Sequence, residues 1–323
     1  MLCLVVLPQG LGENYENKDF VHVQENTMRL VRYEASDGVI RLGALTDRGV
    51  IQLEAAARSL GTPAELFASI NSFLEGGELA LTQGRKVAQD APQSALIPSF
   101  NVGLRAPVPL PRKIVAVGLN YRDHSIESGA KEPPKTPMIF AKFTSSIAGP
   151  GDAIEIPAGD PQVDYEAELG VVIGKKAKGV KATDAYQYVA GYLPLNDVSA
   201  RAWQFADKQW VRGKSCDTFC PIGPCLTTRD EVPDPHALSI CARVNGTTLQ
   251  DSNTSKMIFR VPELIEFISA SITLEPGDVI ATGTPEGVGV FRNPPLFLKP
   301  GDVVEIEIQG LGVLRNPVVA SQK

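Results

Sequence analysis

The amino-acid sequence predicts a mainly β protein with peripheral helices, in the α+β class. Many short segments are apolar or alternate between apolar and polar residues, and Gly, Pro and Asp bound them, which is typical of strands. Strands and helices do not alternate regularly along the chain, which argues against a doubly wound α/β sheet. We therefore expect a folded or barrel-like sheet with helices at its periphery.

Composition argues against several classes of protein. The net charge of −6 argues against a nucleic-acid partner, which would favour a basic face. No segment approaches the roughly 20 apolar residues that a membrane helix needs. The five cysteines include no CxxC pair, so we interpret them as reduced thiols of an intracellular protein. A metal cluster of Cys216, Cys220 and Cys225 is the alternative.

Residues 1–27 are predicted to be a disordered extension of the folded protein. The apolar run from Leu2 to Leu7 is short, no basic residue precedes it, and an acidic stretch follows it. This pattern does not fit a secretory signal peptide, and it lacks the Arg-rich, acid-poor character of a mitochondrial transit peptide. Folded sequence is expected to begin at Met28.

Residues 28–105 are expected to form a small N-terminal α+β domain. Its three strands are separated by turn sequences that contain Asp and Gly, and they cover residues 28–33, 39–45 and 50–53. The proline-rich run at 106–112 then reads as an extended linker.

Two helices are expected after these strands. The first begins at Thr62 as N-cap, with Pro63 at its first position and Glu65 completing a capping box. Apolar residues recur at helical spacing after this start, and the glycine pair at 76–77 ends the helix. A second, weaker helix covers residues 79–89.

Residues 113–320 form a larger unit that is dominated by strands. The expected strands cover residues 113–117, 138–142, 164–173, 238–244, 279–282 and 303–308. Helices are expected at 183–192 and at 261–269, the latter with Pro262 at its first position.

A pair of acidic residues within the strand at 164–173 indicates a metal site. Side chains alternate across a strand, so Glu166 and Glu168 share one face, with Cα atoms about 6.8 Å apart. Two unscreened charges at about 4 Å repel by roughly 4 kcal/mol at an effective dielectric of about 20. A divalent cation such as Mg²⁺ removes that repulsion, and Asp197 could supply a third oxygen ligand. The alternative is that both glutamates line the wet face of an edge strand.

Other polar residues are spaced for acid–base chemistry or substrate binding. His124 and Glu127 are three residues apart, so on a helix they can form a dyad in which the carboxylate orients the imidazole. Arg201 and Gln204 have the same spacing, and the guanidinium could bind a substrate carboxylate. Lys214 could neutralise developing enolate charge. A surface helix with incidental charges is the alternative for the first pair.

Two glycine-containing segments do not match nucleotide-binding patterns. The Gly-Lys-Ser at 213–215 lacks the upstream glycine of a phosphate-binding loop, and Gly287-Val288-Gly289 fails the dinucleotide fingerprint. The segment 282–289 still offers backbone N–H groups and hydroxyls, including that of Thr284, which suit an anionic oxygen. No serine or cysteine stands in a recognisable nucleophile setting, which favours metal-assisted acid–base chemistry.

Taken together, these segments resemble the fumarylacetoacetate hydrolase superfamily over residues 113–318. The branch called fumarylacetoacetate hydrolase domain-containing protein 2 is the most similar, and it also has a small N-terminal domain. The resemblance is carried by Lys113–Tyr121, His124, Asp164–Gly170, Asn196–Arg201, Gly213–Ser215 and Thr282–Pro285. Residues 113–320 are then expected to be the catalytic domain of this type.

The resemblance implies a mixed β-sandwich roll, a Mg²⁺ or Mn²⁺ ion and a homodimer. By position, the metal ligands would be Glu166, Glu168 and Asp197, the substrate-binding residues Arg201, Gln204 and Thr284, and the catalytic residues His124, Glu127 and Lys214. Two departures stand out, because Leu119 occupies a position where relatives often carry Arg, and Ala202 replaces a common Asp. The first is expected to alter distal substrate specificity and the second to loosen support of the site.

The function that follows from the resemblance is metal-dependent chemistry on a small 2-oxo dicarboxylic acid through a metal-stabilised enolate. Oxaloacetate enol–keto tautomerisation fits this chemistry best. Water activated by His124 would instead give C–C hydrolysis of acylpyruvates, and the same enolate would allow decarboxylation of oxaloacetate. A non-catalytic binding scaffold is a further alternative. The resemblance implies a mitochondrial location, and a cytoplasmic one stays open.

Overall fold

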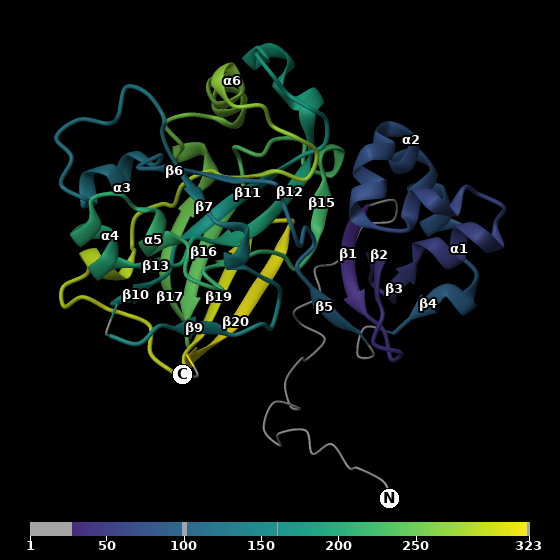
Figure 1. Ribbon diagram of the computed structural model, residues 1–323, viewed down its shortest axis with the longest axis horizontal. Helices are drawn as coiled ribbons and strands as arrows, with labels where there is room; N and C mark the ends of the chain where they lie inside the picture. Colours follow the sequence, from purple (N-terminus) through teal and green to yellow (C-terminus); the bar gives the residue numbers. More distant parts are fainter. Residues whose placement is uncertain (1–27, 99–101, 160, 322–323) are drawn as a thin grey trace, which may run out of the picture.

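Two large β-sheets form the frame of the molecule (Figure 1). The structure is a computed structural model that describes residues 28–98, 102–159 and 161–321. The expected extension at 1–27 lies outside the described residues. The larger sheet has 11 strands, and its path runs β4 (Leu96–Ile97), β3 (Gly49–Gln52), β2 (Ile40–Thr46), β1 (Arg29–Glu34), β15 (Leu226–Thr228), β12 (Val189–Asn196), β11 (Ala167–Ile173), β18 (Val279–Ala281), β6 (Ile114–Gly118) and β7 (Met138–Lys142), with β5 (Gly103–Arg105) paired to β1.

The second large sheet has five strands and packs against the first to form a sandwich. Its order is β17 (Thr247–Asn253), β16 (Ser239–Val244), β19 (Val303–Ile308), β20 (Gly312–Ala320) and β9 (Ile154–Ile156). Two short sheets pair β10 (Val163–Asp164) with β13 (Ser199–Ala200) and β14 (Cys220–Pro221) with β8 (Ile147–Ala148). Because β6 runs parallel to β18 while most other pairs are antiparallel, the sandwich is mixed.

Strand β11 lies at the centre of the molecule. All seven of its residues are buried. Leu169 and Val171 face the core between the two sheets, whereas Val172 packs into a second core that is shared with the N-terminal residues. A strand buried on both faces needs an almost continuous apolar run, which is what the sequence has here apart from its acidic residues.

Residues 28–98 pack beside the rest of the described chain, and their strands β1 to β4 extend the larger sheet beyond β15 (Figure 1). Strand β1 pairs antiparallel with β15, with Leu30 opposite Leu226. The second core joins residues such as Phe67 and Phe73 to Leu193 and Leu195 of β12. The predicted N-terminal unit therefore shares both backbone hydrogen bonds and apolar contacts with the rest of the described chain.

The helix predicted to begin at Thr62 is placed differently in the structure. A 3-10 helix, η1 (Ala64–Phe67), occupies its first turn without a side-chain cap. The α-helix α2 (Ile70–Gln89) begins after Ser69, whose Oγ accepts a hydrogen bond from the Ser72 backbone N–H at 3.0 Å. Gly77 has φ 53° and ψ −132°, so the glycine pair interrupts the helix as predicted. A further helix, α1 (Leu53–Ser59), was not predicted.

The prediction of a helix over the whole of 183–192 is wrong. A 3-10 helix, η5 (Ala182–Tyr188), is followed by the strand β12, which pairs with β11 and β15. Val189 and Tyr192 are buried in this strand, and their β-branched and aromatic side chains suit a buried sheet. The helix predicted at 261–269 is confirmed as α6 (Val261–Ser271), with a proline in its first turn.

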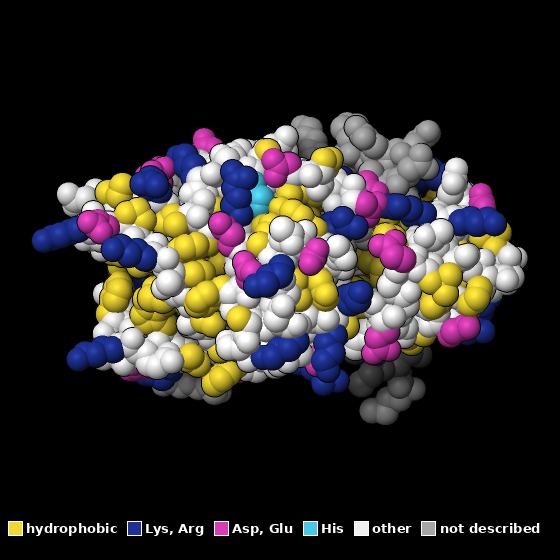
Figure 2. Space-filling view, turned by 90° about the horizontal axis from the view of Figure 1, so that it is seen from above, with side chains coloured by type: hydrophobic (Ala, Val, Ile, Leu, Met, Phe, Trp, Pro, Cys, Tyr) yellow, Lys and Arg dark blue, Asp and Glu magenta, His cyan; other side chains and the backbone are white. Residues whose placement is uncertain are grey.

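Three short helices lie near the end of the larger sheet at which β11 begins and β12 ends. They are α3 (Arg122–Glu127), α4 (Arg201–Asp207) and α5 (Val211–Lys214). The remaining 3-10 turns are η2 (Gln93–Ala95), η4 (Thr144–Ser146), η6 (Arg229–Glu231), η7 (Thr254–Lys256) and η8 (Gly289–Phe291). Figure 2 shows Lys and Arg side chains interspersed with Asp and Glu on one face. In the described part of the chain, no helix is long and apolar enough to span a membrane.

Candidate active site and metal centre

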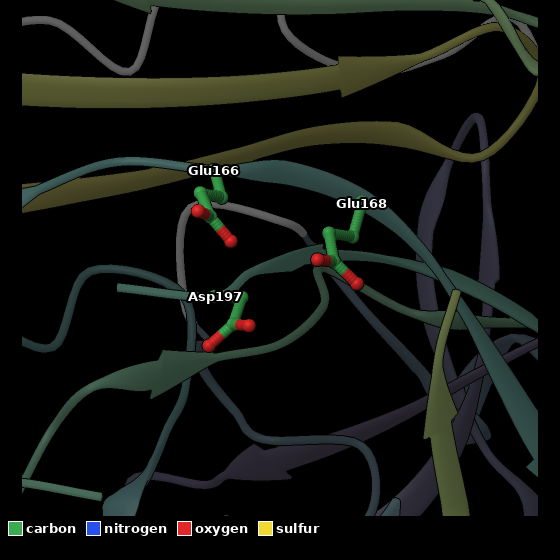
Figure 3. Close-up of side chains that lie close together, drawn as sticks. All are labelled: Glu166, Glu168 and Asp197. Carbon is green, nitrogen blue, oxygen red and sulfur yellow. The ribbon is translucent and has the colours of Figure 1, made fainter. Parts of the chain in front are cut away.

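Three buried carboxylates converge at the junction of β11 and β12 (Figure 3). Glu168 lies in β11 and Glu166 just before it, and Asp197 follows β12. Because β12 is antiparallel to β11 with Ala167 opposite Asn196, Asp197 comes next to Glu166, and its backbone N–H donates to the Glu166 carbonyl at 3.0 Å. One oxygen from each carboxylate lies within 4.8 Å of the others. The alternative of a wet edge strand is wrong, because Glu166 and Glu168 are 5% and 1% exposed.

The electrostatics of this cluster fit a divalent cation. Burial raises the pKa of Glu168 well above its ordinary value, and the charges of Asp197 and Glu166 raise it further. Burial also opposes ionisation of Glu166, but the charges of Lys214 and Arg201 outweigh it and lower its pKa to about 2. Across residues 28–98, 102–159 and 161–321, no Lys or Arg forms an ion pair with Glu168. Three hard oxygen donors, one of which has no Lys or Arg partner among the described residues, suit Mg²⁺ or Mn²⁺.

Lys214 binds two of the three acids directly. It ends α5, is 2% exposed, and its Nζ donates to Glu166 Oε2 at 2.6 Å and to Asp197 Oδ2 at 2.8 Å. Burial lowers the pKa of Lys214, but Asp197 and Glu166 raise it by more, so the amine stays protonated. The predicted ammonium group therefore lies within the acid cluster.

A second buried lysine, Lys142, was missed in the sequence. Its Nζ donates to Asp197 Oδ1 at 2.6 Å and to the backbone carbonyl of Lys214. It ends β7, and it is the only charged residue in that strand. The only indication of its role in the sequence is that a single lysine ends an otherwise apolar strand. Its partners could not be predicted from this, because they are 55 and 72 positions away in the chain.

Arg201 is held by acids on two sides. Its Nε donates to Asp164 Oδ2 at 2.8 Å, and its Nη2 lies 2.7 Å from Glu166 Oε1. Because Arg201 begins α4, Gln204 lies one turn further on, and Arg201 Nη1 donates to Gln204 Oε1 at 3.0 Å. Burial lowers the pKa of Arg201, but Glu166 and Asp164 outweigh this effect and raise it. The predicted pair of substrate-binding residues is thus in contact.

Asp164, which was not among the predicted site residues, connects the acid cluster to the loop at 289–292. Besides Arg201, its carboxylate accepts hydrogen bonds from the backbone N–H groups of Gly289 at 2.7 Å and of Val290 at 3.0 Å. The side chain is fully buried. Its position two residues before Glu166 was the only signal of this role in the sequence.

Substitution of Gly289 by Ala is expected to destabilise this connection. A Cβ at Gly289 would lie 1.9 Å from the Leu296 carbonyl oxygen and 2.6 Å from Asp164 Oδ1. Overpacking of this kind costs about 1–3 kcal/mol of unfolding free energy, which urea unfolding of the metal-free protein would measure. Gly103→Ala is the matched control, because nothing lies within 4 Å of a Cβ there. Equal stability of the two variants would contradict the prediction.

His124 and Glu127 form the contact that their spacing predicts. His124 Nδ1 and Glu127 Oε2 are 3.1 Å apart, and helix α3 brings both side chains onto one face. Glu127 Oε1 also accepts a hydrogen bond from the Gly287 backbone N–H at 3.0 Å. The His124 ring is buried and lies 6.1 Å from the Phe291 ring, measured between centroids. A carboxylate at Nδ1 leaves Nε2 of the imidazole for other contacts.

The glycine-containing loop after β18 contacts the acid cluster through its backbone. The Gly283 N–H donates to Glu168 Oε2 at 2.8 Å, which agrees with the expectation that this loop faces an anionic oxygen. Thr284 is fixed by Gln250, whose Nε2 donates to Thr284 Oγ1 and to the Pro285 carbonyl, both at 2.8 Å. Gln250 was also missed in the sequence.

A cavity of about 260 Å³ brings the predicted residues together. Its lining includes His124, Glu166, Glu168, Asp197, Arg201, Gln204, Lys214 and Thr284. Of the nine predicted site residues, Glu127 alone does not line this cavity; it contacts His124 and lines an adjoining cavity. Enclosed cavities with a few convergent polar groups are typical of sites for small molecules.

The fold and this cavity define a small-molecule site at one end of a mixed β-sandwich. The chain belongs to the fumarylacetoacetate (FAA) hydrolase family, whose C-terminal model matches residues 113–319. Oxaloacetate tautomerase fahd2, mitochondrial, from Xenopus laevis is 51% identical over 298 residues, which cover 91% of each chain. Oxaloacetate tautomerase FAHD2A, mitochondrial, from Homo sapiens is 49% identical over 297 residues, with 90% of this chain and 92% of that one covered.

Solved structures show the same fold. A maleylpyruvate hydrolase from Sphingobium sp. SYK-6, in complex with manganese(II) ion and pyruvate, is 32% identical with a TM-score of 0.74. A fumarylacetoacetate hydrolase from Exiguobacterium antarcticum is 35% identical with a TM-score of 0.75. Each matches 91% of this chain and 100% of its own. The resemblance to the superfamily and the predicted mixed β-sandwich are confirmed.

Proposed function

We propose that this chain is an oxaloacetate enol–keto tautomerase, an isomerase that requires Mg²⁺ or Mn²⁺. The observation that carries the proposal is the buried cluster of three carboxylates, with Lys214 and Arg201 bound to it inside one cavity. The relatives that are about half identical in sequence are named as oxaloacetate tautomerases. A solved family member holds manganese(II) together with pyruvate, a 2-oxo acid.

In this proposal Glu166, Glu168 and Asp197 hold the metal ion. A bound divalent ion would polarise the carboxylate and 2-oxo oxygens of the substrate and so favour the enolate. Glu168 is the one of the three acids that forms no ion pair with a Lys or Arg of the described residues, so it gains most from such an ion. The proposal covers both Mg²⁺ and Mn²⁺, because oxygen ligands suit both ions.

The remaining residues would bind the substrate and stabilise the charge that develops on it. Arg201 and Gln204 would bind the substrate carboxylate, with Thr284 as a further hydrogen-bonding group. Lys214 stays protonated, so it would stabilise the negative charge that develops on the 2-oxo oxygen. Tautomerisation then moves one proton between C3 and this oxygen, and no carbon–carbon bond breaks.

The His124–Glu127 contact favours a second candidate, C–C hydrolysis of acylpyruvates. A carboxylate-oriented imidazole can activate water as a general base, and the two groups are 3.1 Å apart. Decarboxylation of oxaloacetate would proceed through the same enolate. One preparation, assayed for keto–enol exchange and for pyruvate release with and without EDTA, distinguishes these reactions. Metal binding without turnover of any 2-oxo acid would favour a non-catalytic scaffold.

Replacement of His124 by Ala is expected to separate the two activities. Tautomerisation of oxaloacetate should stay within about threefold of wild type, whereas general-base assistance of hydrolysis is worth about 10²–10⁴-fold and should be lost. Ultraviolet absorbance of the enol measures the first activity, and pyruvate release from acylpyruvate measures the second. A loss of tautomerisation as large as the loss of hydrolysis would show that His124 moves the proton in both reactions.

We also propose a homodimer and a mitochondrial location. The named relatives are described as mitochondrial, and the family resemblance implies the dimer. Sedimentation of the purified chain tests the first proposal. Imaging of the tagged full-length chain in cells tests the second, with a cytoplasmic distribution as the contrary outcome.

A further inference from the structure

The cavity in front of the acid cluster has a charged floor and an apolar outer wall. The floor residues Glu168, Asp197 and Lys214 are at most 2% exposed. We define the outer wall by the lining residues Leu119, Phe140, Phe205, Trp210 and Phe291. Phe205 is 53% exposed and Phe291 is 37% exposed, so these two mark the mouth of the cavity. A substrate held at the floor would extend its distal group along this wall.

The outer wall is held in place by close packing. The rings of Phe140 and Trp210 are 5.3 Å apart and meet edge to face at 74°. Trp210 packs onto the backbone at Gly118, where a Cβ would lie only 2.6 Å from the indole ring. Leu119 follows with φ 55°, a left-handed backbone conformation that leucine rarely adopts. Strained backbone of this kind is common beside binding sites.

Among the described residues, the five that form the outer wall include no cation for a second substrate carboxylate, and Arg292 and Lys299 line a separate cavity that adjoins this one at Phe291. Among the described residues that line the cavity, Arg201 and Lys214 supply the Lys and Arg groups, and both are paired with Glu166. Their proposed role at the 2-oxo acid end leaves neither for the distal group. Outside the cavity, Arg212 pairs with Asp207 at 2.6 Å and stacks on an indole ring. An apolar distal group therefore suits the wall, whereas the distal carboxylate of oxaloacetate would keep its contact with water at the mouth, beside the half-exposed Phe205.

We propose that the site also accepts 2-oxo acids whose distal group is apolar or aromatic, and that it catalyses their enol–keto exchange. This inference rests on the proposed function, and phenylpyruvate is the probe. The 2-oxo acid end binds at the floor as oxaloacetate does, and the ring packs edge to face or offset against Trp210 and Phe140. One proton leaves C3 and one is added to the 2-oxo oxygen, so the reaction needs no oxidant or second substrate.

The experiment compares kcat/KM for the enols of phenylpyruvate and oxaloacetate on the metal-loaded enzyme, by their ultraviolet absorbance. We expect EDTA-sensitive turnover of both. Phe205→Lys places a cation at the mouth, so the ratio of phenylpyruvate to oxaloacetate kcat/KM should fall by about tenfold or more. Leu119→Arg should shift the ratio in the same direction. Phe267→Lys is the matched control, because Phe267 is 39% exposed on α6, outside the cavity.

Each outcome separates this inference from the proposed function. Turnover of oxaloacetate without turnover of phenylpyruvate overturns the inference and leaves the proposed function intact. Turnover of phenylpyruvate alone supports the inference and overturns the assignment of oxaloacetate. Absence of both activities in protein that binds Mn²⁺ overturns both proposals. An unchanged ratio in both wall variants overturns the role of the outer wall in specificity, because a general loss of folding would lower both rates together.

Discussion

Replacement of Glu168 by Gln is expected to abolish metal binding and turnover without destabilising the metal-free protein. Gln keeps the shape of the side chain and removes one of three neighbouring negative charges. Loss of a carboxylate ligand should weaken Mn²⁺ or Mg²⁺ binding by at least about 100-fold, since even outer ligand partners are worth about 10–100-fold. Turnover should fall at least as much. Isothermal titration of Mn²⁺ and the enol assay measure the two effects.

The stability of the same variant has a defined dependence on pH. Because the folded-state pKa of Glu168 is raised by burial and by the charges of Asp197 and Glu166, metal-free wild type loses stability as the pH rises from the unfolded pKa towards the folded one. Gln does not ionise, so the variant should become more stable than wild type over this pH range. Urea unfolding measures the difference. Glu78→Gln, on the exposed side of α2, is the control, and a Glu168→Gln variant less stable than this control would contradict the prediction.

Replacement of Lys214 by Met is expected to destabilise the metal-free protein and to leave metal binding intact, the opposite of the effects expected for Glu168→Gln. Its ammonium group binds Glu166 and Asp197 in the metal-free structure, so its removal leaves two buried charges with less compensation. Breaking a buried ion pair on one side costs about 3–5 kcal/mol, which should appear as a lower melting temperature without metal. Mn²⁺ should bind at least as tightly as to wild type, because a competing cation is gone. Mn²⁺ should therefore raise the melting temperature of the variant by more than it raises that of wild type.

Turnover of the Lys214→Met enzyme should nevertheless fall by about 10²–10³-fold in kcat, the usual effect of removing one group that stabilises developing oxyanion charge. Saturating metal should not restore it. Lys86→Met, on the exposed surface of α2, is the matched control and should resemble wild type in every assay. Full activity of Lys214→Met at saturating Mn²⁺ would show that the amine has no part in the reaction.

The acid cluster could be predicted from the sequence because its geometry is local. Glu166 and Glu168 share a face through the two-residue period of a strand, and Asp197 follows the next strand in the same sheet. Lys142 could not be placed in this way. It reaches Asp197 only because long-range pairing places β7 in the same sheet as β11 and β12, with β18 and β6 between β7 and β11.

The errors in secondary structure have a similar cause. The segment 189–196 is apolar on both faces, and a short buried strand of this kind cannot be told from a buried helix by periodicity. Its pairing with β11 and β15 decides the matter. The helix start at Thr62 had the right capping residues, but the chain there forms only a 3-10 turn before Ser69 caps α2. At both places the local sequence is compatible with more than one structure, and tertiary packing decides which one forms.

The pairing of β1 with β15 limits how the chain can be shortened. If residues 28–105 were removed, β15 would become an open edge whose backbone N–H and C=O groups lack partners. Leu193 and Leu195, which now contact the N-terminal core, would also become exposed to water. An exposed edge beside apolar side chains is a template for aggregation. Strand β1 thus covers the edge of β15 and keeps it from pairing with other chains, in addition to any contribution that the N-terminal strands make to folding.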